Sequence, residues 1–140
     1  MARWHVRAVA ALAFGTSAAA QPAGDVRGFN GAWEVTLVCP LWKGALRYTV
    51  VFLATVSDGH LHGQFGQQNQ PDSLTYEGTI HPDGGASIIA NGVTGPPKFN
   101  IDQVPEGHAY GYHVTAQFEG SHGHGKRTEV RPSDVDFVRQ

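Results

Sequence analysis

Cysteine is nearly absent from the 140-residue chain, which contains only Cys39. A single cysteine cannot form a disulfide within the chain, so packing and hydrogen bonds must hold the fold together. Cys39 has the same alternating parity as the apolar residues Trp33, Val35 and Leu37. We therefore expect it to be a small buried hydrophobic residue; a reactive or intermolecularly paired thiol is the alternative.

The chain also lacks an apolar run long enough to cross a bilayer, which requires about 20 residues. Its start instead has the pattern of a signal peptide, with basic Arg3 and Arg7, an alanine-rich stretch over 6–14 and small residues up to Ala20. We predict cleavage near Ala20 and export to the periplasm or the outside of the cell, without membrane insertion of the mature chain. The predicted divisions are a signal peptide over 1–20, a flexible leader over 21–28 and one domain over 29–140.

Basic charge is scarce in the predicted mature chain. Loss of Arg3 and Arg7 leaves eight Lys and Arg against twelve Asp and Glu, a net charge of about −4 with histidine neutral. Nucleic acids attract positively charged surfaces. We therefore expect no nucleic-acid partner.

The common catalytic motifs are missing as well. The sequence has no G-x-S-x-G nucleophile elbow and no H-E-x-x-H, and no histidine is tied to Cys39 by a characteristic spacing. Glu34, Glu77 and Glu119 occupy outward strand positions, where carboxylates are ordinarily solvated. We predict a protein that is not an enzyme and has no cofactor.

Alternation of apolar and polar residues is the pattern that the chain has in abundance. Apolar residues recur at every second position from residue 46 to 56, Asp58-Gly59 follows, and the same parity resumes at Leu61 and Phe65. This predicts a β-hairpin over 45–65 with one buried face. The other predicted strands lie over 29–39, 74–80, 86–94 and 110–118 and around 135–137, with short strands possible over 98–104 and 126–130.

The predicted fold is all-β, with seven or eight antiparallel strands in an up-and-down meander. Short turns such as 81–85 join the strands, and no long segment has the helical period of 3.6 residues. Closing the meander into a small barrel pairs the first strand with the last and leaves no edge exposed, so we favour a barrel over a sandwich. A barrel of about eight strands is either filled by side chains or holds one small ligand.

Five aromatic residues share the inward parity and form a candidate ligand-binding set: Trp33, Tyr48, Tyr76, Tyr110 and Tyr112. Aromatic rings contact apolar ligands, and phenol hydroxyls orient them. The same residues also suit a fully packed core, so parity leaves both interpretations open. The predicted function is an exported binding or interaction protein, either a carrier of a small apolar molecule or an adaptor that contacts a protein through loops 67–72 and 120–131.

Two His-x-His pairs suggest a metal-binding protein as the alternative function. His60 and His62 project from one outward strand face, and His122 and His124 lie in a predicted Gly/His loop over 120–125. Paired imidazoles bind Zn or Cu when a third ligand joins them. Solvent-exposed histidines beside turns are the simpler explanation.

One local cluster of basic residues follows the predicted Gly/His loop. A glycine-rich loop with guanidinium groups can bind a phosphate or carboxylate. The stretch does not match a G-x-x-x-x-G-K-[ST] phosphate loop, however. We instead expect Lys126, Arg127 and Arg131 to form surface ion pairs with Glu129, Asp134 or Asp136.

The segment Gly31-Ala-Trp-Glu-Val-Thr-Leu-Val-Cys39 and the ending Arg131-Pro132 to Phe137-Val-Arg-Gln140 resemble a group of small exported bacterial β-barrel proteins of uncharacterised function. The resemblance implies a second cysteine after the Arg-Pro pair, bridging to the first. Ser133 occupies that position here, so the implied disulfide is lost. The Gly-x-Trp opening and the meander are also similar in architecture to avidin-like and lipocalin-like barrels, which implies no particular ligand.

Overall fold

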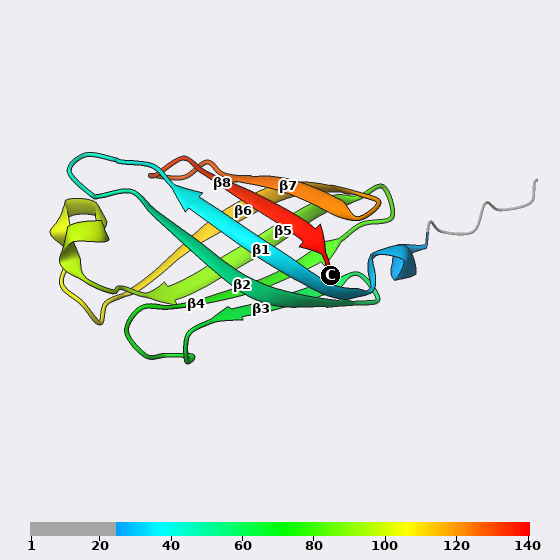
Figure 1. The fold of residues 1–140 in the computed structure, drawn as a ribbon, viewed down its shortest axis with the longest axis horizontal. Helices are drawn as coiled ribbons and strands as arrows, with labels where there is room; N and C mark the ends of the chain where they lie inside the picture. The colour runs from blue at the N-terminus through cyan, green and yellow to red at the C-terminus, as the bar shows by residue number, and fades with distance from the viewer. Residues whose placement is uncertain (1–24) are drawn as a thin grey trace, which may run out of the picture.

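Eight antiparallel strands close into one barrel in the computed structural model, which describes residues 25–140 (Figure 1). Each strand pairs with the next in the chain, and the first pairs with the last. The predicted barrel is therefore confirmed over the sandwich. The predicted signal peptide lies outside the described residues. The strands are β1 (Gly31–Cys39), β2 (Tyr48–Ser57), β3 (His60–Phe65), β4 (Ser73–Ile80), β5 (Gly85–Val93), β6 (Ala109–Glu119), β7 (His122–Arg127) and β8 (Ser133–Arg139).

The hairpin of β2 and β3 forms as the alternation predicts. Asp58 and Gly59 both have positive φ, at 49° and 79°, which suits the tight two-residue turns that match strand twist. The strand begins at Tyr48 rather than at Ala45, however. Ala45 forms an isolated bridge with Trp42, and Leu46 is 45% exposed, so the inward alternation starts later than predicted.

The two ends of the barrel differ, because alternate connections of a meander fall at the same end. The closed end carries the short turns at 58–59, 81–84 and 120–121, together with the 3-10 turn η1 (Val26–Phe29). The open end carries four longer connections, at 40–47, 66–72, 94–108 and 128–132. In Figure 1 the open end lies on the left, and the chain terminus at Gln140 lies near the closed end on the right. Within residues 25–140 no helix has the length and apolar character needed to span a membrane.

Aromatic side chains fill the closed end. The Trp33 ring meets Phe118 edge-on at 5.1 Å between ring centroids, and Phe118 contacts both Phe29 and Phe137. The indole nitrogen of Trp33 donates to the carbonyl of Phe29 over 2.9 Å, which fixes η1 across this end. The Arg139 guanidinium also donates to the carbonyls of Gly28 and Asn30, so this turn is tied to the last strand as well.

Strand β7 occupies the place of the predicted Gly/His loop, and that prediction is wrong. Gly123 and Gly125 take the inward positions of β7, where a side chain has no room. An added Cβ would lie 2.8 Å from the Phe118 ring at Gly123 and 2.9 Å from the Ala116 methyl at Gly125. Glycines at the inward positions hide the apolar alternation by which a strand is recognised in sequence.

Cys39 is fully buried on β1, as predicted, and its sulfur accepts a hydrogen bond from Ser133 Oγ on β8 over 3.6 Å. The two strands are adjacent, and Val38 pairs with Asp134 immediately before this contact. Directly opposed strand residues have the Cα separation that a disulfide requires. A cysteine at position 133 would therefore lie close enough to Cys39 to form a disulfide.

Ser133→Cys is expected to form a disulfide with Cys39 and to raise the free energy of unfolding by about 2–4 kcal/mol. The bridge would link the first strand to the last and so reduce the conformational entropy of the unfolded chain. Thiol titration should show no free sulfhydryl, and urea unfolding should shift to higher concentration only without reductant. A variant that keeps two free thiols under oxidising conditions would contradict the geometry.

Candidate ligand-binding pocket

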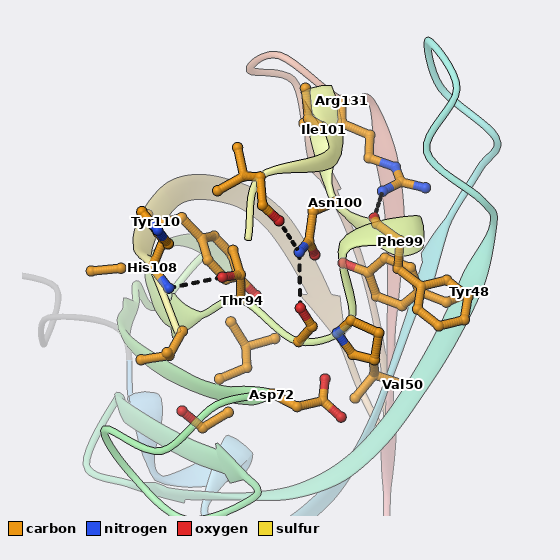
Figure 2. A pocket seen from close by; sticks show the side chains of 18 of the residues that line it. Tyr48, Val50, Asp72, Thr94, Phe99, Asn100, Ile101, His108, Tyr110 and Arg131 are labelled. Carbon is orange, nitrogen blue, oxygen red and sulfur yellow. Dashed lines mark hydrogen bonds between the residues drawn. The ribbon is translucent and has the colours of Figure 1, made fainter. Parts of the chain in front are cut away.

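A cavity of about 580 Å³ opens at the long-loop end of the barrel. Its wall is formed by the ends of strands β2 to β7 and by residues of the connections at 66–72, 94–108 and 128–132. Figure 2 shows Tyr48, Val50, Phe99 and Tyr110 around this space. The barrel is therefore packed at its closed end and hollow at its open end. The packed core and the ligand cavity, which the sequence pattern left as alternatives, are both present.

The five predicted aromatic residues do not form one site. Tyr48 and Tyr110 line the cavity, whereas Tyr76 and Tyr112 lie buried beneath it and Trp33 is buried at the closed end. The Tyr110 ring stacks on Tyr112 at 6.2 Å, and the hydroxyls of Tyr76 and Tyr112 are 3.0 Å apart. Tyr48 and Tyr110 therefore form part of the cavity wall, and Tyr76 and Tyr112 belong to the packed core next to it.

Tyr110 owes its position to a glycine on the neighbouring strand. Tyr110 and Gly92 are directly paired between β6 and β5. An added Cβ on Gly92 would lie only 2.5 Å from Cζ of the Tyr110 ring, so the ring lies across the bare glycine backbone. A residue with a side chain at position 92 would move this ring and change the shape of the cavity wall.

Burial raises the pKa of all four tyrosines, and burial is the first cause in each case; the pKa of Tyr110 rises to about 12. A phenol with a raised pKa holds its proton more tightly when folded, so its contribution to stability is complete below about pH 10 and is lost as the pH rises toward the folded pKa. We expect one alkaline transition above about pH 10, in which tyrosinate absorbance and circular dichroism change together. Phenols that ionise in the folded barrel near their ordinary pKa would contradict this expectation.

The connection at 94–108 forms a fixed wall of the cavity. The predicted strand over 98–104 is wrong, because two 3-10 turns, η2 (Pro97–Phe99) and η3 (Ile101–Gln103), occupy this segment. Asn100 lies between them, and its side-chain amide donates to the carbonyls of Gly95 and Val104 over 2.9 and 2.8 Å (Figure 2). The Thr94 hydroxyl ties the two ends of the connection together by donating to Pro105 O and accepting from the His108 backbone N–H.

Arg131 is a buried structural residue, so its predicted role in surface ion pairing is wrong. Its side chain is only 2% exposed, and all three guanidinium nitrogens donate to backbone carbonyls. The acceptors are Pro40 O, Leu46 O and Phe99 O, so one side chain joins the connections at 40–47 and 94–108. The cation also lies 5.1 Å from the centroid of the Tyr48 ring.

Arg127 is also buried, at 7% exposed, and its predicted surface ion pair is not formed. It is the last residue of β7, on the same inward face as Gly123 and Gly125, and it lines the cavity. Its guanidinium lies over the Tyr112 ring at 4.1 Å from the centroid, and Nε donates to the backbone carbonyl of Glu129 over 3.1 Å. The inward parity of β7 is the sequence signal that would have placed this arginine in the barrel.

Comparisons of the chain with family models, with curated proteins and with solved structures find no match. Its function is therefore inferred from the cavity itself.

The predicted metal-binding histidines lie on the outer surface of the barrel, next to carboxylates. His60 and His62 on β3 both contact the Glu77 carboxylate of β4, and His124 on β7 contacts Asp136 of β8 over 2.9 Å. His122 is likewise on β7 rather than in a loop, and β3 and β7 are not neighbours in the barrel. In the part of the chain from 25 to 140, no three His, Cys, Asp or Glu side chains are grouped to hold a metal ion. Metal binding stays a prediction that titration with Zn or Cu can test.

Proposed function

We propose that this protein is an exported, non-enzymatic carrier that binds one small, mainly apolar molecule in the open end of its barrel. The observation that carries the proposal is the cavity of about 580 Å³, which falls within the usual range of small-molecule sites, roughly 300–1,000 Å³. Export is supported by the basic, apolar and small-residue regions of the first twenty residues.

The lining of the cavity suits an apolar ligand. Its wall includes the side chains of Val50, Phe65, Leu74, Phe99 and Tyr110. The burial of such surfaces against a ligand stabilises a complex by about 25 cal/mol for each Å² of apolar area removed from water.

The wall is also held in place before any ligand binds. The hydrogen bonds of Asn100 and Thr94 fix the 94–108 connection, and Arg131 joins it to the 40–47 connection. A preformed site avoids the entropy cost of ordering loops on binding. This rigidity supports ligand binding in the cavity.

Two measurements test the carrier function. Native mass spectrometry of the purified mature protein should detect a co-purifying small molecule. The neutral apolar dye phenylnaphthylamine should bind with a rise in fluorescence. Val50→Trp, which fills the cavity, should reduce dye binding about tenfold or more, because a filled site cannot bury the ligand.

Val51→Trp is the matched control. Val51 is the next residue of β2, points outward and is 51% exposed. It should leave dye binding unchanged. If the dye does not bind the native protein, or if the two variants bind it equally, the carrier proposal fails.

A further inference from the structure

Arg127 carries a positive charge into the cavity without a carboxylate to balance it. Within residues 25–140, no Asp or Glu oxygen lies within 4 Å of its guanidinium nitrogens. The nearest acid in the sequence is Glu129, and its carboxylate faces away and pairs with His113 Nδ1 at 2.6 Å. Asp72 and Asp102 also line the cavity, and both are exposed residues of its surrounding connections.

The hydrogen bonds of Arg127 are also incomplete. Only Nε has an acceptor, the Glu129 carbonyl, and no acceptor in the described chain receives a bond from either terminal nitrogen. Arg131 offers a direct contrast, because each of its three nitrogens donates to a carbonyl. The terminal nitrogens of Arg127 therefore remain accessible and can donate to a molecule in the cavity that Arg127 lines. A largely buried cation without a carboxylate favours an anionic partner.

The geometry points to a carboxylate-bearing ligand: we infer that Arg127 recognises the anionic group of an otherwise apolar or aromatic molecule bound in the cavity. This inference rests on the proposed carrier function and specifies its ligand class. A guanidinium presents two parallel N–H groups that match the two oxygens of a carboxylate.

Two neighbouring features prepare Arg127 for this role. Its stacking on Tyr112 and its Nε bond to the Glu129 carbonyl fix the plane of the guanidinium, so its terminal nitrogens need little reordering. The Tyr110 phenol lines the same cavity and stays protonated at neutral pH, since burial raises its pKa to about 12. The site therefore offers a fixed cation and a neutral hydroxyl donor at one end of an apolar space.

Isosteric pairs of acids and amides test the inference. Naphthylacetic acid and naphthylacetamide, and octanoic acid and octanamide, are each titrated against bound phenylnaphthylamine at neutral pH. The native protein should prefer each acid over its amide by about tenfold or more, the usual gain from a charge-assisted pair in a desolvated site. The measured quantity is the ratio of the affinities for the acid and its amide. A change in cavity shape affects both ligands alike and therefore leaves this ratio unchanged.

Three variants assign the preference to one residue. Arg127→Met should bring the ratio to about one or below, and Arg127→Lys should retain part of it because the charge stays. Lys126→Met removes the adjacent charge, which is outward and exposed on β7, and should leave the ratio unchanged.

The outcomes separate the two proposals. If the dye does not bind at all, the carrier function fails and the inference fails with it. If the dye binds but the native protein shows equal affinity for acid and amide, the carrier function stands and the role of Arg127 is refuted. An acid preference that survives in Arg127→Met also refutes that role.

Discussion

Arg131→Met is expected to lower the free energy of unfolding by about 3–5 kcal/mol, because three backbone carbonyls lose their hydrogen-bond donor. The variant leaves the carbonyls of Pro40, Leu46 and Phe99 without their donors inside the protein. Each unsatisfied buried acceptor costs about 1–3 kcal/mol, partly recovered where water can enter. Urea unfolding followed by circular dichroism measures the loss.

Arg127→Met is the matched control for this prediction. It is the same substitution at a second buried arginine of the same barrel, but Arg127 donates to only one carbonyl in the described chain. Removal of Arg127 should cost far less, because only one carbonyl loses its donor. Equal losses in the two variants would show that Arg131 does not act through its three carbonyls.

Arg131→Met should also weaken dye binding, because Phe99 O loses the hydrogen bond from Arg131 that ties Phe99 to the rest of the open end. Phe99 lines the cavity and contacts the Tyr48 ring at 6.0 Å between centroids. Dye affinity in the folded variant measures this effect separately from stability. Unchanged affinity would mean that Asn100 and Thr94 hold the wall without Arg131.

Trp33→Ala is expected to cost about 3–5 kcal/mol, the typical loss for truncating a fully buried tryptophan. The indole is 0% exposed, and three contacts depend on it: the edge-on packing of Phe118, the hydrogen bond to Phe29 O and the Arg139 cation at 4.9 Å. Its loss should open the closed end and release η1. Urea unfolding by circular dichroism gives the magnitude, and exchange of backbone amide protons in η1 reports the local release.

Trp42→Ala provides the control with the same chemical change. Trp42 lies in the 40–47 connection, is only partly buried, and its indole nitrogen is buried without a hydrogen-bond partner within the described residues. Its replacement should change stability by about 1 kcal/mol or less, since an unsatisfied donor disappears with the ring. A larger loss of stability for Trp42→Ala than for Trp33→Ala would contradict the conclusion that aromatic packing at the closed end stabilises the barrel.

The sequence was most informative where strands alternate cleanly and a turn has its own chemistry. The hairpin around Asp58-Gly59 follows from the period of two, and closure between β1 and β8 follows from the need to remove sheet edges. Parity also placed Tyr48 and Tyr110 inside the barrel. It did not give their depth, because all inward residues share one parity whether they lie near an end or in the middle.

The residues that sequence reasoning missed are those whose type conflicts with their position. The nearby acids Glu129, Asp134 and Asp136 favour surface ion pairs for Arg127 and Arg131, whereas both arginines are buried. Arg127 nonetheless has the same inward parity as the glycines of β7. Arg131 follows Val130, whose positive φ of 59° interrupts the extended backbone, so strand alternation does not predict which way Arg131 points. The turns around Asn100 were missed because their stability comes from side-chain bonds to carbonyls rather than from a periodic pattern.

The closed end has a practical consequence for handling the protein. Gln140 donates its backbone N–H to Ala32 O over 2.9 Å, and η1 lies at the same end, so both ends of the described chain leave the barrel on the side away from the cavity. An affinity tag, a fluorescent fusion or a biosensor surface joined after Gln140 would therefore present the cavity toward the solution. Immobilised protein should bind the dye with the same affinity as free protein.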